Sequence, residues 1–181
     1  LTTAFLTFGY TLWVALGLIY PKLKNESTHS LKRGFQFLFP LVVIQIIWGA
    51  YVAGLNAGKV YNSWPKMGEK WVADGVTAMQ PWYLNFVEGI AGVQFIHRYL
   101  AYAVVALVLF LFWKARKTKL SSSQRWGVNS LVIAVSVQFI LGIFTLLYAV
   151  PVSLGLLHQL GAFLLLGTVI FSLHRFSVSN F

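Results

Sequence analysis

The chain has 181 residues, of which 58% are hydrophobic, 17% aromatic and only 10% charged. About a quarter of the residues of a soluble domain are charged, so this chain has too few charges to cover a globular core, and we expect an integral membrane protein. Cysteine is absent, which excludes disulfides, thiolate metal ligands and cysteine nucleophiles. The net charge of +10 would suggest nucleic-acid binding in a soluble protein. Here the cations lie between apolar runs, so we expect them to mark membrane topology and expect no nucleic-acid partner.

Five apolar stretches predict transmembrane helices, because about 20 apolar residues span the roughly 30 Å core of a bilayer. They cover approximately residues 1–20, 34–53, 93–113, 126–150 and 151–173. Pro151 opens the last stretch, where proline suits the first turn of a helix. Pro40 falls inside the second, where neighbouring helices can satisfy the carbonyl that it frees. The predicted fold is all-α: a four-helix transmembrane bundle, one additional N-terminal transmembrane helix, and a long extracytoplasmic loop with an interfacial helix.

Charged residues are distributed unequally between the two ends of these helices. The basic side, formed by residues 21–33, 114–125 and the C-terminus, carries ten cations and one acidic residue. The loop side, formed by residues 54–98 and the turn near residue 150, carries four cations and three acidic residues. The positive-inside rule then puts the basic side in the cytoplasm, or in the matrix of a mitochondrion. We expect a multi-pass protein of the bacterial cytoplasmic membrane or the mitochondrial inner membrane.

A short pattern near the N-terminus recurs near the C-terminus. Ala4-Phe5-Leu6 with Gly9 matches Ala162-Phe163-Leu164 with Gly167. In this register His158 corresponds to the position just before Leu1. Because Leu1 itself stands inside an apolar stretch, we expect the chain to be a piece of a longer, duplicated protein in which a histidine precedes it.

A second pattern links the second and fourth apolar stretches. Gln45 and Gly49 recur as Gln138 and Gly142, and each glutamine lies a similar distance from a basic-side arginine. Both patterns should therefore lie at the same depth. A glycine near a glutamine allows close helix packing and an interhelical hydrogen bond, so packing alone is a sufficient explanation at this point.

Two of the four histidines lie inside predicted membrane helices. His97 and His158 each lie about one turn into a helix that starts from the loop side, so they should share one depth. Ionisable residues inside a membrane segment are costly and indicate function. Each is followed four residues later by alanine, Ala101 and Ala162, which leaves room for a flat porphyrin. His29 and His174 lie at helix ends and are interpreted as solvated or headgroup-facing.

The donor set favours haem over other metal sites. No Cys, Asp or Glu lies within the two helices, so zinc or copper would lack further ligands. A bis-histidine haem needs only two imidazoles, which makes His97 and His158 candidate axial ligands of a haem iron. The alternative is a pair of histidines that only hydrogen-bond across the bundle. Arg98 is a candidate partner of a haem propionate, or it snorkels to the membrane interface.

Three segments resemble one protein family. They are GAYVAGLNAGKVYNSWPKM at residues 49–67, VQFIHRYLAY at 93–102 and VPVSLGLLHQLGA at 150–162. In this order they resemble the C-terminal half of haem A synthases. The resemblance covers residues 34–175, and residues 1–20 resemble the last helix of the N-terminal half.

The resemblance implies an organisation and an activity. It implies an eight-helix protein of two similar four-helix bundles that oxidises the C8 methyl of haem O to a formyl group, giving haem A for terminal oxidases. Residues 1–20 would be the last transmembrane helix of a truncated N-terminal half, 21–33 a cytoplasmic basic linker, and 34–175 a bundle that binds haem b through His97 and His158 near the extracytoplasmic side. Haem O and the catalytic glutamate would belong to the other half, and nothing marks Glu88 as that carboxylate.

The expected partners are the lipid bilayer, the N-terminal half of the same protein, haem O synthase and an electron donor. Two other functions stay open at this point. One is a stand-alone membrane cytochrome b for electron transfer, and the other is a non-redox membrane protein in which both histidines are structural.

Overall fold

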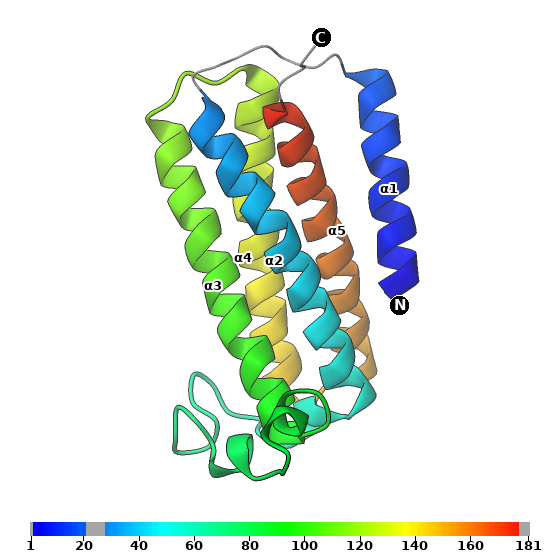
Figure 1. The fold of residues 1–181 in the computed structure, drawn as a ribbon, viewed down its shortest axis with the longest axis vertical. Helices are drawn as coiled ribbons and strands as arrows, with labels where there is room; N and C mark the ends of the chain where they lie inside the picture. Colours follow the sequence, from blue (N-terminus) through cyan, green and yellow to red (C-terminus); the bar gives the residue numbers. More distant parts are fainter. Residues whose placement is uncertain (1, 21–27, 178–181) are drawn as a thin grey trace.

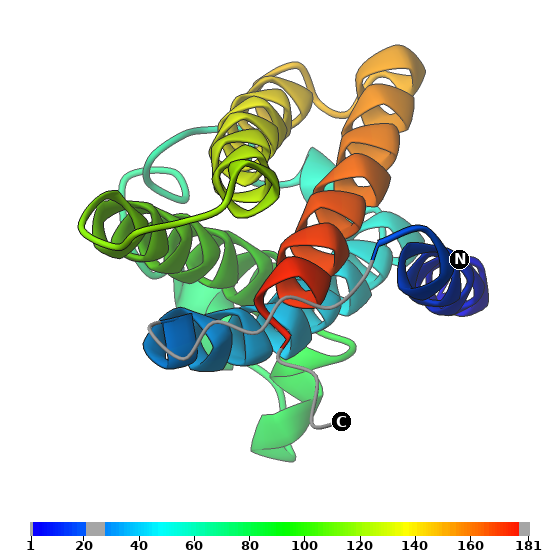
Figure 2. The same cartoon turned by 90° about the horizontal axis from the view of Figure 1, so that it is seen from above.

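The computed structural model describes residues 2–20 and 28–177. In this part of the chain five α-helices follow one another: α1 (Thr2–Ile19), α2 (His29–Gly54), α3 (Ile90–Arg116), α4 (Ser122–Leu147) and α5 (Val152–Phe176). Helices α2 to α5 form an up-and-down bundle, and α1 lies outside it along α5 (Figures 1 and 2). By length and composition α2 to α5 can each cross a membrane, whereas α1 is a shorter apolar helix. The all-α fold with four membrane-spanning segments and an extra N-terminal helix is therefore confirmed at this level.

The helix ends differ from the predicted ones by a few residues. Helix α2 begins at His29, so its first turns carry basic residues that were predicted to form a linker, while residues 21–27 lie outside the described residues. Helix α4 begins at Ser122, because Ser121 and Gln124 form a capping box: the Gln124 N–H donates to Ser121 Oγ (3.3 Å) and the Ser121 N–H to Gln124 Oε1 (3.0 Å). It ends at Leu147, because Ala149 and Val150 turn the chain with φ of 56° and 59°.

The long loop contains no α-helix over residues 55–89, so the predicted interfacial helix is wrong. The loop instead forms three short 3-10 turns: η2 (Ala57–Lys59), η3 (Asp74–Thr77) and η4 (Trp82–Phe86). Positive φ angles at Asn56 (51°) and Gly68 (67°) interrupt any longer helix. Side chains satisfy some of the backbone carbonyls of the loop. The Asn85 Nδ2, for example, donates to the carbonyls of Met79 and Trp82.

The larger of the two buried apolar clusters lies from the middle of the bundle to its basic side. Its residues in α2 to α5 are Leu31, Phe35, Leu38, Val42, Val104, Val108, Leu111, Ala115, Val128, Leu131, Val135, Leu165, Leu166, Val169, Ile170 and Phe176. Phe35 and Phe176 stack there with ring centroids 4.7 Å apart. Apolar side chains therefore fill most of the bundle interior at its basic side.

Candidate functional site

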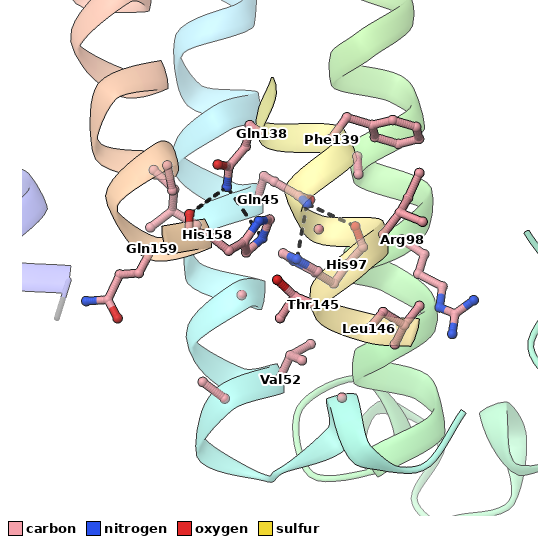
Figure 3. Close-up of a pocket in the computed structure, with 18 of the residues that line it drawn as sticks. Gln45, Val52, His97, Arg98, Gln138, Phe139, Thr145, Leu146, His158 and Gln159 are labelled. Atoms are coloured by element: carbon pink, nitrogen blue, oxygen red, sulfur yellow. Dashed lines mark hydrogen bonds between the residues drawn. The ribbon is translucent and has the colours of Figure 1, made fainter. Parts of the chain in front are cut away.

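A cavity of about 290 Å³ lies inside the loop-side half of the bundle. All four long helices contribute polar residues to its lining, among them Gln45 of α2, His97 of α3, Gln138 of α4 and His158 of α5. Figure 3 shows the two imidazole rings between the helices, with the two glutamines beside them on the basic side. Loop residues such as Asn56, Gly58 and Trp64 also line the cavity. His97 and His158, which the sequence analysis paired, therefore line the same cavity.

His97 contacts α2 at two residues, Gln45 and Gly49. The Gln45 side-chain amide donates to the His97 carbonyl oxygen (3.0 Å), and its Nε2 lies 3.5 Å from His97 Nε2. One turn further along α2, a Cβ added to Gly49 would lie 3.1 Å from His97 Cε1. The glycine therefore allows the imidazole to lie directly against the α2 backbone.

His158 makes the equivalent contacts with Gln138 and Gly142 of α4. The Gln138 side-chain amide donates to the His158 carbonyl oxygen (2.9 Å), with its Nε2 3.4 Å from His158 Nε2. A Cβ added to Gly142 would lie 2.9 Å from His158 Cε1. Both copies of the Gln-x-x-x-Gly pattern, for which packing alone was a sufficient explanation from the sequence, therefore contact a histidine of the cavity.

The residues present fit a group held by two axial ligands. The Nδ1 atoms of His97 and His158 are buried and have no hydrogen-bond partner, so each imidazole carries a polar atom that the protein alone does not satisfy. Ala101 and Ala162 also line the cavity, as the porphyrin hypothesis requires. No three His, Cys, Asp or Glu side chains come together among residues 2–20 and 28–177. Two imidazoles that face one largely apolar cavity are a suitable donor set for a haem iron.

Arg98 faces away from the histidine pair, toward the loop (Figure 3). Its guanidinium donates to the carbonyls of Ser63 (2.8 Å), Lys66 (3.1 Å) and Tyr61, and to Gln94 Oε1 (3.2 Å). Both Nη atoms therefore hold the loop, and only the buried Nε lacks a partner. Its pairing with a haem propionate stays a prediction.

The remaining titratable candidates lie elsewhere. His29 is exposed at the start of α2, as predicted, and Glu88 is exposed just before α3. His174 is 1% exposed, so its predicted headgroup-facing position is wrong. The reason is α1, whose Trp13 ring lies edge-on to the His174 ring with centroids 5.3 Å apart.

Tyr102 is a cavity residue that the sequence analysis missed. Its hydroxyl is buried without a partner, and its ring lies 5.8 Å from the ring of Phe139, another cavity residue. No spacing signal pointed to it, because helix residues that share a face with His97 lie three or four positions away, not five.

Comparisons with known proteins identify a family. Residues 1–170 match the family described as COX15-CtaA, cytochrome oxidase assembly protein. A protein named "Heme A synthase" from Flavobacterium johnsoniae is 49% identical over 179 residues, which cover 98% of this chain and 52% of that protein. The "Heme A synthase" of Flavobacterium psychrophilum is 48% identical over the same shares. "Heme A synthase COX15" of Arabidopsis thaliana is 37% identical over 92% of this chain and 38% of that protein.

The chain spans about half the length of the two flavobacterial relatives that it matches. No solved structure matches it. Since the family pattern covers residues 1–170 and both flavobacterial proteins are nearly half identical to it, the chain belongs to the COX15-CtaA family, that of the haem A synthases.

Proposed function

We propose that this chain is the haem b-binding half of a haem A synthase, the enzyme that oxidises the C8 methyl of haem O to the formyl group of haem A. The observation that carries the proposal is the pair His97 and His158, which line one cavity and each have a buried, unpartnered ring nitrogen. Family membership supports the activity of the whole protein, of which this chain spans about half.

The role of this half follows from its donor set. A haem held by two imidazoles would supply one-electron storage or transfer. His97 and His158 would hold the iron, while Ala101 and Ala162 leave space for the ring. No residue of this chain is proposed as catalytic, and haem O oxidation is assigned to the N-terminal half. The proposed partners in the membrane are the N-terminal half, haem O synthase and an electron donor. The haem would lie near the extracytoplasmic side.

A stand-alone membrane cytochrome b is the second candidate function. The same two histidines support it, but the family membership favours the synthase. Structural histidines without haem are disfavoured by the family membership, because the relatives are named as haem A synthases.

Difference spectra of the full-length protein that contains this chain test the proposal. We expect the reduced-minus-oxidised spectrum to contain a b-type band that is lost in the His97→Ala/His158→Ala double variant. The matched control is His29→Ala, which changes an exposed histidine outside the cavity and should keep the band. A band unchanged in the double variant would refute haem binding here.

Haem A production separates the two redox functions. The intact gene should restore haem A to a strain that cannot make it. A protein that shows the b-type band but never restores haem A would instead be the stand-alone cytochrome.

A further inference from the structure

The two ends of the cavity differ in polarity. Toward the loop its lining includes Asn56 and Lys59, whereas toward the basic side it becomes aliphatic. The aliphatic lining residues are Val42, Val104, Val105, Val135 and Leu165. Burial of an unpaired charge among aliphatic side chains is costly. A ligand with one apolar and one ionic edge therefore fits this cavity in one direction, with its ionic edge toward the loop.

The loop-side end is also positively charged. The two charged lining residues are Lys59 of η2 and Arg98, which follows His97 on α3. No aspartate or glutamate of the residues that the structure describes lines the cavity. Two cations without a nearby acidic residue attract an anionic group to this end.

Only one of these two cations is largely free of protein partners. Both Nη atoms of Arg98 donate to loop carbonyls. The ammonium of Lys59, in contrast, has no hydrogen-bond acceptor and no ion-pair partner among residues 2–20 and 28–177, and the residue is exposed. Asp74 of the same loop pairs with Lys70 instead, at 2.7 Å. Lys59 is therefore the cation of the cavity whose charge is available to a ligand.

The backbone just before Lys59 is fixed to both helical hairpins. Ala57 and Gly58 are buried, and the Ala57 carbonyl accepts a hydrogen bond from Gln94 Nε2 of α3 (2.9 Å). Gly58 lies against the turn between α4 and α5, where a Cβ on it would be 2.7 Å from Val150 Cγ2. The lysine side chain thus starts from a fixed point at the edge of the cavity.

Asn62 strengthens this connection. Its Nδ2 donates both to the Gly58 carbonyl (2.6 Å) and to the Leu146 carbonyl of α4 (2.8 Å). The segment that contains Lys59 is therefore held by α3 and α4 together. Such a preorganised segment binds a ligand without a further ordering cost for its backbone.

We propose that Lys59 binds a propionate carboxylate of the haem, and that the haem lies in the cavity with its propionate edge toward the loop. The proposal rests on the haem-binding function proposed above. A lysine ammonium is a compact charge on a flexible stem, which suits a carboxylate at the edge of a cavity. The aliphatic end would receive the opposite edge of the porphyrin. His97 and His158 would fix where the iron lies, while charge decides which edge of the ring faces the loop.

Lys59→Met in the full-length protein tests the assignment, because methionine keeps most of the apolar stem and removes the charge. Lys59→Arg keeps the charge. Lys66→Met is the matched control, since Lys66 is an exposed lysine of the same loop that does not line the cavity. Each protein is reconstituted with haem or with haem dimethyl ester, in which both propionates are blocked. The measurements are the rate of haem loss at low and high salt and the midpoint potential, followed on the b-type band that the His97→Ala/His158→Ala variant lacks.

We expect Lys59→Met to lose haem about two- to fivefold faster than wild type at low salt, as loss of a partly exposed ion pair allows. The difference should shrink at high salt, because salt screens exposed charges. The midpoint potential should fall, because removal of a positive charge favours the ferric state. Lys59→Arg and Lys66→Met should match wild type. With the dimethyl ester, wild type and Lys59→Met should lose the ligand at the same rate, as a double-mutant cycle requires for a direct contact.

Two results would overturn the proposal while the haem-binding function stands. One is equal loss of ordinary haem by Lys59→Met and wild type at low salt. The other is a Lys59→Met effect of the same size with the dimethyl ester, which would mean that the lysine acts on the loop and not on a propionate. A wild-type protein with no b-type band would overturn the haem-binding function itself.

Discussion

The closest glycine contact behind a histidine gives the sharpest test of the cavity geometry. In Gly142→Ala the new methyl would lie 2.9 Å from His158 Cε1, and in Gly49→Ala it would lie 3.1 Å from His97 Cε1. Two carbon atoms prefer a separation of about 3.5–4.0 Å. The ring or the helix must therefore move by about 0.6–1.1 Å in the first variant and by about 0.4–0.9 Å in the second.

The expected cost follows from that displacement. Extra methyl groups in a packed interior cost about 1–3 kcal/mol, which corresponds to a loss of about 5- to 150-fold in haem affinity. Gly142→Ala should lose more than Gly49→Ala because its contact is shorter. Alanine also favours the helix over glycine by about 1 kcal/mol, but this gain is common to both variants and to the control.

Gly17→Ala is the matched control. Gly17 is on α1, which lies outside the bundle, and a Cβ there would meet nothing within 4 Å. The assay is the haem-to-protein ratio of the purified full-length protein, followed by the rate at which an excess of a haem-free globin removes the haem. If Gly142→Ala retained haem as well as Gly17→Ala, the imidazole would not lie against α4 as the structure has it.

Four further substitutions test the cavity, the loop and the start of α4. Ala101→Leu and Ala162→Leu put a bulky side chain into the cavity, so each variant should lose the b-type band in the visible spectrum. The helix content, measured by far-UV circular dichroism, should change little. A full b-type band in both variants would contradict a porphyrin packed against these helical turns. Arg98→Gln removes charge-assisted hydrogen bonds to three loop carbonyls, each worth about 1.5–3 kcal/mol. Amide exchange in residues 57–67 should then rise by more than about tenfold in mass spectrometry, and unchanged exchange would show that the loop is held by other contacts. Ser121→Ala removes the cap of α4 and should lower the free energy of unfolding by about 1 kcal/mol, measured as a lower thermal midpoint. Ser122→Ala, at an exposed neighbouring position, is the control that leaves the cap in place.

Much of the fold could be predicted because hydropathy is a local property. About 20 apolar residues suffice to define a membrane helix, and the four long spans appear where the sequence predicts them. Their ends could not be predicted as well, because side chains outside the apolar run set them. Ser121 and Gln124 cap α4, and the apolar face of Leu31 and Phe35 extends α2 toward the basic side.

Errors arose where burial depends on a distant segment. His174 stands at a helix end beside Arg175, a pattern typical of a solvated residue, yet the Trp13 ring of α1 lies edge-on to it. The loop is rich in aromatic residues, which suggested an interfacial helix. Its backbone is instead held by Arg98 and Asn85, whose contacts no sequence pattern reveals.

The sequence by itself determined a multi-pass helical protein, its charge asymmetry and the depth at which His97 and His158 lie, because helix length and spacing convert directly into distance along the membrane normal. It also contained the repeated Gln-x-x-x-Gly pattern without showing what that pattern contacts. Only the tertiary structure decided this, by pairing α2 with α3 and α4 with α5 so that each glycine and each glutamine faces a histidine. Rotation of a helix about its own axis decides such contacts, and that rotation depends on the packing of all its neighbours together.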